Sequence, residues 1–143
     1  KDVNCWMLVV NDLCKQAALD RRMVIRGPSN AVRNFITMTD VCMGLDFLVS
    51  NPQERVSPII CNLGDKTKTI GNIASAIKSI YLKEKGIDLE IIELSNDRSE
   101  TQYLDFRSSV LADMGYQWSS NYKEELIELV KFCELEFGAR NAN

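Results

Sequence analysis

Arg33 is the residue whose position most clearly calls for a chemical explanation. It opens the stretch RNFITMTDV (33–41), in which strand-forming residues are followed at once by the start of a helix. A guanidinium group stays charged, and its planar fork binds oxyanions through two parallel hydrogen bonds. A cation at the mouth of an otherwise apolar strand therefore predicts an anionic partner, either a ligand or a nearby carboxylate such as Asp40.

The residue types that are missing exclude several kinds of site. The chain has no histidine, so a Ser-His-Asp triad, a Cys-His dyad or a histidine metal site cannot be built from this chain alone. No G-x-G-x-x-G turn occurs, and we therefore expect no dinucleotide binding by these residues themselves. The acids of 81–90 and 122–137 alternate with lysines opposite apolar stripes, which is typical of solvated helix faces and predicts no metal.

The cysteines give no sign of a disulfide framework or a zinc site, because they are odd in number and scattered among apolar residues. We expect reduced, buried thiols in a cytoplasmic protein. The cysteines are Cys5, Cys14, Cys42, Cys61 and Cys133.

Charge and hydropathy narrow the range of partners. The net charge is −3 and no basic stripe is present, which argues against binding to nucleic acid. The longest apolar run, 6–10, is too short to span a bilayer, so we expect a soluble protein with no membrane partner. A length of 143 residues predicts a single domain over 1–143.

Apolar periodicity predicts alternating helices and strands. Thr39 or Asp40 is expected to cap the second helix, whereas Thr69 and Gly86 are expected to cap the two ends of the third. The alternation indicates an α/β or α+β fold. Helices are predicted at about 5–19, 40–49, 69–86, from Asp105 or Arg107 to Gly115, and after 117–121; strands are predicted at 23–26, 32–38, 57–65 and 89–94.

Four landmarks in this order resemble a known family: the strand and helix start of 33–41, ICNLG (60–64), the Thr-capped helix at 69, and LDFRSSVLADMGY (104–116). Together they resemble the C-terminal half of the extended short-chain dehydrogenases, and more narrowly the nucleotide-sugar epimerases and dehydratases. WMLVVNDLCKQA (6–17) is similar to a pattern in a branch linked to lipopolysaccharide and exopolysaccharide synthesis. The match covers nearly the whole chain.

The resemblance implies a two-part enzyme. In this family an N-terminal Rossmann domain holds NAD and carries a catalytic Tyr-x-x-x-Lys pair, and the C-terminal part closes over a nucleotide-diphosphate sugar. This chain would be that second part, an α/β (α+β-like) lobe without the Rossmann core and without a cofactor of its own. Its partners would be the sugar nucleotide and its own N-terminal domain, and the resemblance also allows a homodimer.

The resemblance implies four substrate-binding residues, Arg33, Arg98, Asn62 and Asn11. Arg33 would reach a phosphate of the nucleotide diphosphate, although the family usually has an acid where Asn34 stands. Arg98 lies in the polar loop from which the family often supplies a second phosphate-binding arginine; a solvated arginine is the alternative.

The remaining candidates have structural alternatives. Asn62 matches a strand-end asparagine that binds ligand or backbone, and a role in fixing the Gly64 turn is favoured. Asn11 and Trp6 fall where relatives place groups near the base or sugar, but a helical tryptophan is more often a packing residue. Asp105 is interpreted as a helix cap rather than a catalytic acid.

Tyr81 and Lys85 have the spacing of the family's catalytic pair. However, they lie at the end of an amphipathic helix, with Tyr81 on its apolar stripe. We interpret this pair as packing, and expect the catalytic pair upstream.

The resulting hypothesis is the substrate-binding lobe of an NAD-dependent nucleotide-sugar epimerase or dehydratase, an isomerase or lyase of cell-surface polysaccharide synthesis. Asn34 and the short loop around Arg98 keep open a non-catalytic dehydrogenase-like module that binds a nucleotide or a protein partner. A freestanding small α/β module would require a complete chain, and the start at Lys1 speaks against that.

Overall fold

The structure, a computed structural model, describes residues 5–52, 60–64, 66–95, 104, 106–119 and 121–138. It contains both helices and strands, as the alternating pattern predicts. In chain order the elements are η1 (Cys5–Met7), α1 (Val9–Asp20), β1 (Arg22–Ile25), β2 (Val32–Phe35), α2 (Met38–Ser50), β3 (Lys66–Thr69), α3 (Ile70–Lys85), β4 (Glu90–Glu93), α4 (Ser109–Asp113) and α5 (Tyr122–Phe137).

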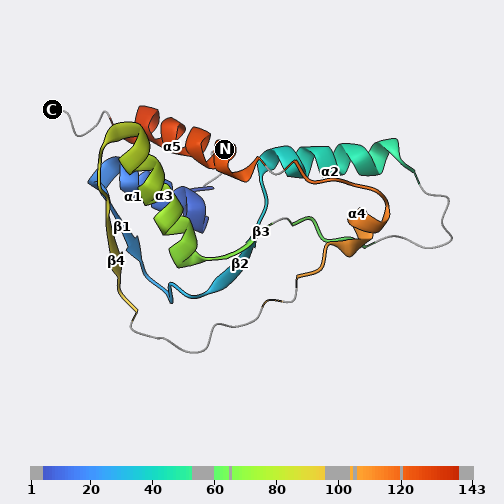
Figure 1. Ribbon diagram of the computed structural model, residues 1–143, viewed down its shortest axis with the longest axis horizontal. Helices are drawn as coiled ribbons and strands as arrows, with labels where there is room; N and C mark the ends of the chain where they lie inside the picture. The colour runs from blue at the N-terminus through green and yellow to red at the C-terminus, as the bar shows by residue number, and fades with distance from the viewer. Residues whose placement is uncertain are drawn as a thin grey trace.

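The main core lies among helices α1, α3 and α5 and the strand pair β1–β4 (Figure 1). Strands β1 and β4 are parallel, with Arg22 opposite Glu90 and Ile25 opposite Glu93. The helices direct one apolar stripe each into this core, which is the usual arrangement for amphipathic helices. The fully buried members include Cys14, Ala17, Met23, Ile73, Ala74, Ile77, Tyr81, Leu89 and Cys133.

Helix α3 begins and ends where the sequence predicts. The Thr69 hydroxyl accepts from the Asn72 N–H at 3.0 Å, and the Asn72 side chain accepts from the Thr69 N–H at 3.3 Å. This reciprocal capping satisfies two backbone donors at the helix start. At the other end Gly86 takes φ 66°, a left-handed conformation that suits glycine and stops the helix.

The Tyr81–Lys85 pair fastens α3 to α5. The Tyr81 hydroxyl donates to Glu134 Oε1 at 2.7 Å, and Lys85 Nζ lies 3.0 Å from Glu134 Oε2. Arg21 also pairs with this carboxylate. Burial, together with Glu134, raises the pKa of the Tyr81 phenol far above its usual range. The packing interpretation of this pair is therefore confirmed.

Strands β2 and β3 form an antiparallel ribbon between the core and α2 (Figure 1). Val32 lies opposite Thr69, and Phe35 lies opposite Lys66. The predicted second strand, 32–38, was too long, because Thr37 already begins the turn into α2. Strand β3 was not predicted.

Helix α2 is capped by Thr37, so the prediction of Thr39 or Asp40 was wrong. A cap residue stands just outside the helix, and Thr37 there has φ −79° and ψ 156° and accepts from the Asp40 N–H at 3.0 Å. Asp40 lies inside the first turn and is fully buried. Its carboxylate accepts from the Ser119 N–H at 2.7 Å and from the Thr37 hydroxyl at 2.9 Å.

The predicted strand at 57–65 is not formed over its described part, 60–64. A strand needs a neighbour for its backbone hydrogen bonds, and the described strands pair with one another instead. Ile60 is left 90% exposed. Helix α4 also starts later than expected, at Ser109, whereas Asp105 lies outside the described residues.

Of the cysteines, Cys14 and Cys133 are buried as predicted, but Cys42 is exposed on α2. Burial raises the pKa of Cys133 to about 11. The described part of the chain has no group of three or more His, Cys, Asp or Glu side chains placed to hold a metal. Within the same ranges, no helix is long and apolar enough to cross a bilayer.

Candidate functional site: a cationic pair on the β2–β3 ribbon

Arg33 lies exposed on β2, and its Nη1 donates to the Val32 carbonyl oxygen at 2.7 Å. It makes no salt bridge with any carboxylate among the described residues. The suggested pairing with Asp40 was wrong, because hydrogen bonds from Ser119 and Thr37 already occupy that buried carboxylate. Burial alone would raise the pKa of Asp40, but those hydrogen bonds and nearby Lys66 hold it below its usual value.

Lys68 lies directly opposite Arg33 in the ribbon. Residues opposite one another in an antiparallel pair place their side chains on the same face, where two like charges repel. The Lys68 ammonium lies 5.5 Å from the centre of the Tyr122 ring. The ribbon therefore presents two neighbouring cations, a combination that an anion would stabilise.

Lys68 was not among the residues predicted from the sequence, because β3 was not predicted to be a strand. The signal was present in KTKT (66–69), since alternate residues of a strand share a face. Lys66 and Lys68 thus lie on one side of β3. The charge of Lys66 helps to lower the pKa of Asp40, whereas Lys68 lies across from Arg33.

Asn34 stands where the family usually has an acid, and its side chain contacts neighbouring protein groups. Its Nδ2 donates to the Thr67 hydroxyl at 3.2 Å. Its Oδ1 lies against Gly64, where an added Cβ would come within 2.1 Å of it and 2.4 Å of the Phe106 ring. A larger residue at this position would force the Asn34 or Phe106 side chain to move. Because Asn34 is neutral, Arg33 has no adjacent carboxylate at this position.

Asn62 and Asn11 also serve local structure. Asn62 Nδ2 donates to the Arg107 carbonyl oxygen at 3.1 Å and so joins 60–64 to the segment before α4. Asn11 Nδ2 donates to the Cys5 carbonyl oxygen at 3.0 Å, which holds η1 against α1. The described contacts connect Gly64 to the ribbon through Asn34, but none connects Asn11 to it. Arg98 lies outside the described residues.

Trp6 packs against α5, as a helical tryptophan usually does. Its ring stacks on Phe132, with centroids 6.2 Å apart, and meets Phe137 edge-on at 4.9 Å. The Lys15 ammonium lies 5.6 Å from the Trp6 ring centre. These contacts account for Trp6 as a packing residue.

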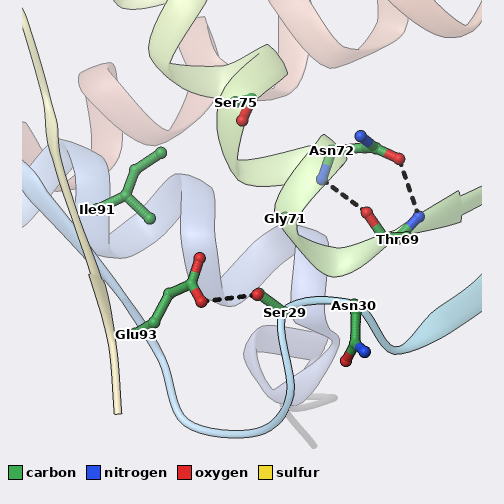
Figure 2. Close-up of a pocket in the computed structure, with 8 residues that line it drawn as sticks. All are labelled: Ser29, Asn30, Thr69, Gly71, Asn72, Ser75, Ile91 and Glu93. Carbon is green, nitrogen blue, oxygen red and sulfur yellow. Dashed lines mark hydrogen bonds between the residues drawn. The ribbon is translucent and has the colours of Figure 1, made fainter. Parts of the chain in front are cut away.

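A separate hollow of about 290 Å³ lies between the start of α3 and the end of β4 (Figure 2). Within it the Ser29 hydroxyl donates to Glu93 Oε2 at 2.7 Å, and the Gly71 N–H donates to the Ser29 carbonyl at 2.8 Å. Its lining residues are Ser29, Asn30, Thr69, Gly71, Asn72, Ser75, Ile91 and Glu93.

This hollow suits neutral hydroxyl groups better than phosphate. The first amides of α3 already donate to protein oxygens, so the positive end of the helix has little left to offer an anion. The Glu93 carboxylate would also repel a phosphate. Because Lys68 and Thr69 are successive residues of β3, their side chains leave opposite faces of the ribbon. The cationic pair and the hollow are therefore distinct features.

No known family profile matches the chain. Over 128 residues it is 26% identical to UDP-sulfoquinovose synthase from Sulfolobus acidocaldarius, a match that spans 88% of this chain and 32% of that protein. Its fold is similar to that of dTDP-glucose 4,6-dehydratase from Bacillus anthracis, solved in complex with NAD. That match has a TM-score of 0.65 at 18% identity and covers 96% of this chain and 40% of the other.

A second solved structure, of an NAD-dependent NDP-hexosamine 5,6-dehydratase involved in tunicamycin biosynthesis, has a TM-score of 0.62 at 16% identity. It is matched over 88% of this chain and 39% of its own length. These likenesses confirm the resemblance to the C-terminal part of the NAD-dependent sugar dehydratases and epimerases. The chain spans about a third to two-fifths of these proteins.

Proposed function

We propose that this chain is the substrate-binding lobe of an NAD-dependent nucleotide-sugar epimerase or dehydratase of cell-surface polysaccharide synthesis. The observation that carries the proposal is the exposed Arg33 guanidinium, which has no carboxylate partner among the described residues and faces Lys68. A guanidinium in this setting can bind phosphate oxygens through two hydrogen bonds. The names of the relatives support the ligand class, since they refer to UDP-, dTDP- and NDP-sugars.

In this proposal NAD is held by the remaining part of the enzyme. The start of α3 does not fit a pyrophosphate, because the Gly71 and Asn72 amides already donate to Ser29 and Thr69. When bound, NAD would supply the transient oxidation of the sugar and the return of the hydride. The task of this lobe is to hold the diphosphate and cover the sugar.

The surface of α2 supports a docked N-terminal dinucleotide-binding domain. Met38, Cys42, Leu45 and Val49 recur at helical spacing along one exposed stripe, and Val49 is 80% exposed. We call this set the α2 stripe. Apolar stripes of this kind mark interaction surfaces. The chain leaves about three-fifths of each solved relative unmatched. We propose that the corresponding part of this enzyme, its own N-terminal domain, covers the α2 stripe.

Arg33 can be tested by titrating UDP-glucose and dTDP-glucose into the chain and into the full-length protein with NAD. We expect salt-sensitive binding that Arg33→Ala weakens roughly tenfold to a hundredfold, the usual range for a lost charge-assisted hydrogen bond. Arg33→Lys should lose less. The control is Arg22→Ala, which removes an exposed arginine at the far end of β1 and should leave affinity unchanged.

Absence of sugar-nucleotide binding by the full-length protein with NAD would contradict the proposal. That outcome would favour a non-catalytic module of the same fold. Equal losses in Arg33→Ala and Arg22→Ala would instead show that general charge, and not a site at Arg33, drives binding.

A further inference from the structure

We infer that Lys68 is the second cation of this site, and that Arg33 and Lys68 together hold one diphosphate across the paired strands β2 and β3. The inference rests on the proposed function and specifies which part of the sugar nucleotide the ribbon takes. It adds a residue that none of the four substrate-binding predictions included.

In the register of the β2–β3 ribbon, Arg33 and Lys68 are direct cross-strand partners. Their Cβ atoms therefore lie about 4.5–5.5 Å apart on one face. Two long cationic side chains anchored that closely can converge on a single ligand.

Arg33 and Lys68 differ from several other cations in their charge compensation. Three other lysines of the described chain have carboxylate partners: Lys78 with Asp88 at 2.9 Å, Lys85 with Glu134 at 3.0 Å and Lys131 with Glu128 at 2.8 Å. Arg33 has a backbone carbonyl and Lys68 an aromatic ring, neither of which carries a full negative charge. The pair thus keeps two uncompensated positive charges within the described surroundings.

The position of the Lys68 ammonium is set by an aromatic ring. It lies 5.5 Å from the centre of the Tyr122 ring at the start of α5. At a partly exposed site this cation–π contact is weak, so it can hold the side chain in place while leaving its charge available. Tyr122 is therefore a positioning residue for Lys68.

The chemistry of the two cations selects a diphosphate over a monophosphate. A guanidinium can donate two hydrogen bonds in its plane to two oxygens of one phosphate. An ammonium acts as a compact point charge that can bind the next phosphate. Lys66 does not compete for this role, because it already faces Asp40. Two adjacent phosphates therefore match the two cations, and a single phosphate leaves one cation unmatched.

The test compares UDP, UMP and inorganic pyrophosphate as probes, with affinity measured by calorimetry on wild type, Lys68→Gln and Lys68→Met. Lys68→Met keeps the apolar stem over Tyr122 and removes only the charge. Both variants should weaken UDP and pyrophosphate roughly tenfold or more and UMP by a smaller factor. Lys68→Arg should keep most of the affinity. The matched control is Lys83→Gln, an exposed lysine on α3 roughly 20 Å further along.

The outcomes separate the inference from the proposed function. If Arg33→Ala weakens UDP binding and both charge-removing Lys68 variants do not, Lys68 is not part of the site and the proposed function stands. If wild type binds neither UDP nor a UDP-sugar, even as the full-length protein with NAD, both fail. Equal losses for UDP and UMP would overturn the assignment of Lys68 to the second phosphate.

Discussion

Helices α3 and α2 are both amphipathic, but they place their apolar residues in opposite environments. Helix α3 buries Ile73, Ile77 and Tyr81 completely against α1 and α5. Helix α2 buries Asp40 and Gly44 and exposes the α2 stripe. Figure 1 shows α2 extending away from the helical cluster, with α4 on the same side.

Several of the contacts that hold α2 are polar or aromatic, and the Leu63 side chain also packs against Gly44. The Tyr116 hydroxyl donates to the Asp40 carbonyl oxygen at 3.2 Å, and the Tyr116 ring lies 5.3 Å from that of Phe47. Trp118 meets Tyr116 edge-on at 4.8 Å. Helix α2 is thus held partly through the buried Asp40, while Leu45 and Val49 are exposed. The two helices therefore differ in that the apolar face of α3 is buried in the core, whereas the α2 stripe is exposed in the described structure.

The largest expected effect compares one substitution in the two regions. Leu13 is 2% exposed on α1, and Leu45 is 51% exposed on α2. Leu13→Ala should lower the free energy of unfolding by about 2–5 kcal/mol. Leu45→Ala should change it by less than about 0.5 kcal/mol. Urea unfolding of the two variants measures the difference, and similar losses would mean that α2 is packed as tightly as the core.

Gly64→Ala tests the contact that Gly64 makes with Asn34 of the ribbon and with Phe106. The new Cβ would overlap Asn34 and Phe106, and relieving such a clash usually costs about 1–3 kcal/mol. The free energy of unfolding should fall by that amount. Gly27→Ala is the control, because a Cβ there meets nothing within 4 Å. An equally mild effect at both glycines would contradict the close contact at Gly64.

Two carboxylates, Glu134 beside the main core and Asp40 in α2, link the stability of the protein to pH. Burial by itself raises the pKa of Glu134, but hydrogen bonds from Arg21, Tyr81 and Lys85 outweigh it and leave the pKa lowered. The pKa of Asp40 is lowered too. A lowered folded-state pKa gives stability that is present above the unfolded-state value and is lost as pH falls through the folded-state value.

Glu134→Gln and Asp40→Asn should therefore each flatten the acid limb of a stability–pH curve below about pH 5. Near neutral pH each should lower the free energy of unfolding by about 1–3 kcal/mol, the range for a lost charged partner. Thermal melts from pH 7 to pH 3 measure both effects. An unchanged acid limb in either variant would show that its carboxylate does not contribute as described.

The smallest effect on stability is expected at the α2 stripe itself. Leu45→Glu should leave the unfolding free energy within about 0.5 kcal/mol of wild type. It should nevertheless reduce binding of a hydrophobic dye by the chain and weaken association with the proposed N-terminal domain, expressed separately. Leu82→Glu, at an exposed leucine on α3, is the control. Undiminished association of Leu45→Glu would exclude the stripe as the docking surface.

The elements that the sequence predicted well are those fixed by local contacts. Helix α3 has its capping residues, Thr69 and Gly86, within its own segment, and its apolar period needs no distant partner to be recognised. Strand β3 is different, because its four residues are polar and become a strand through pairing with β2. Segment 57–65 is the converse case: its composition favours a strand, but its described part, 60–64, is not paired as one.

The same distinction explains the candidate site. Arg33 could be predicted because it stands alone in an apolar strand. Lys68 could not, because its significance depends on the cross-strand register. Tyr81 matched a catalytic spacing, and its position on the apolar stripe was the better guide to its role, which is to bind Glu134.

The central claim, that the β2–β3 ribbon binds a diphosphate, is tested most directly by mapping UDP onto the chain. Amide chemical shifts of isotopically labelled protein would be followed through a titration with UDP. Saturable shifts concentrated at Val32–Phe35 and Lys66–Thr69, absent in Arg33→Ala, are the predicted result. Shifts concentrated instead around Ser29, Ser75 and Glu93 in the hollow would contradict the claim.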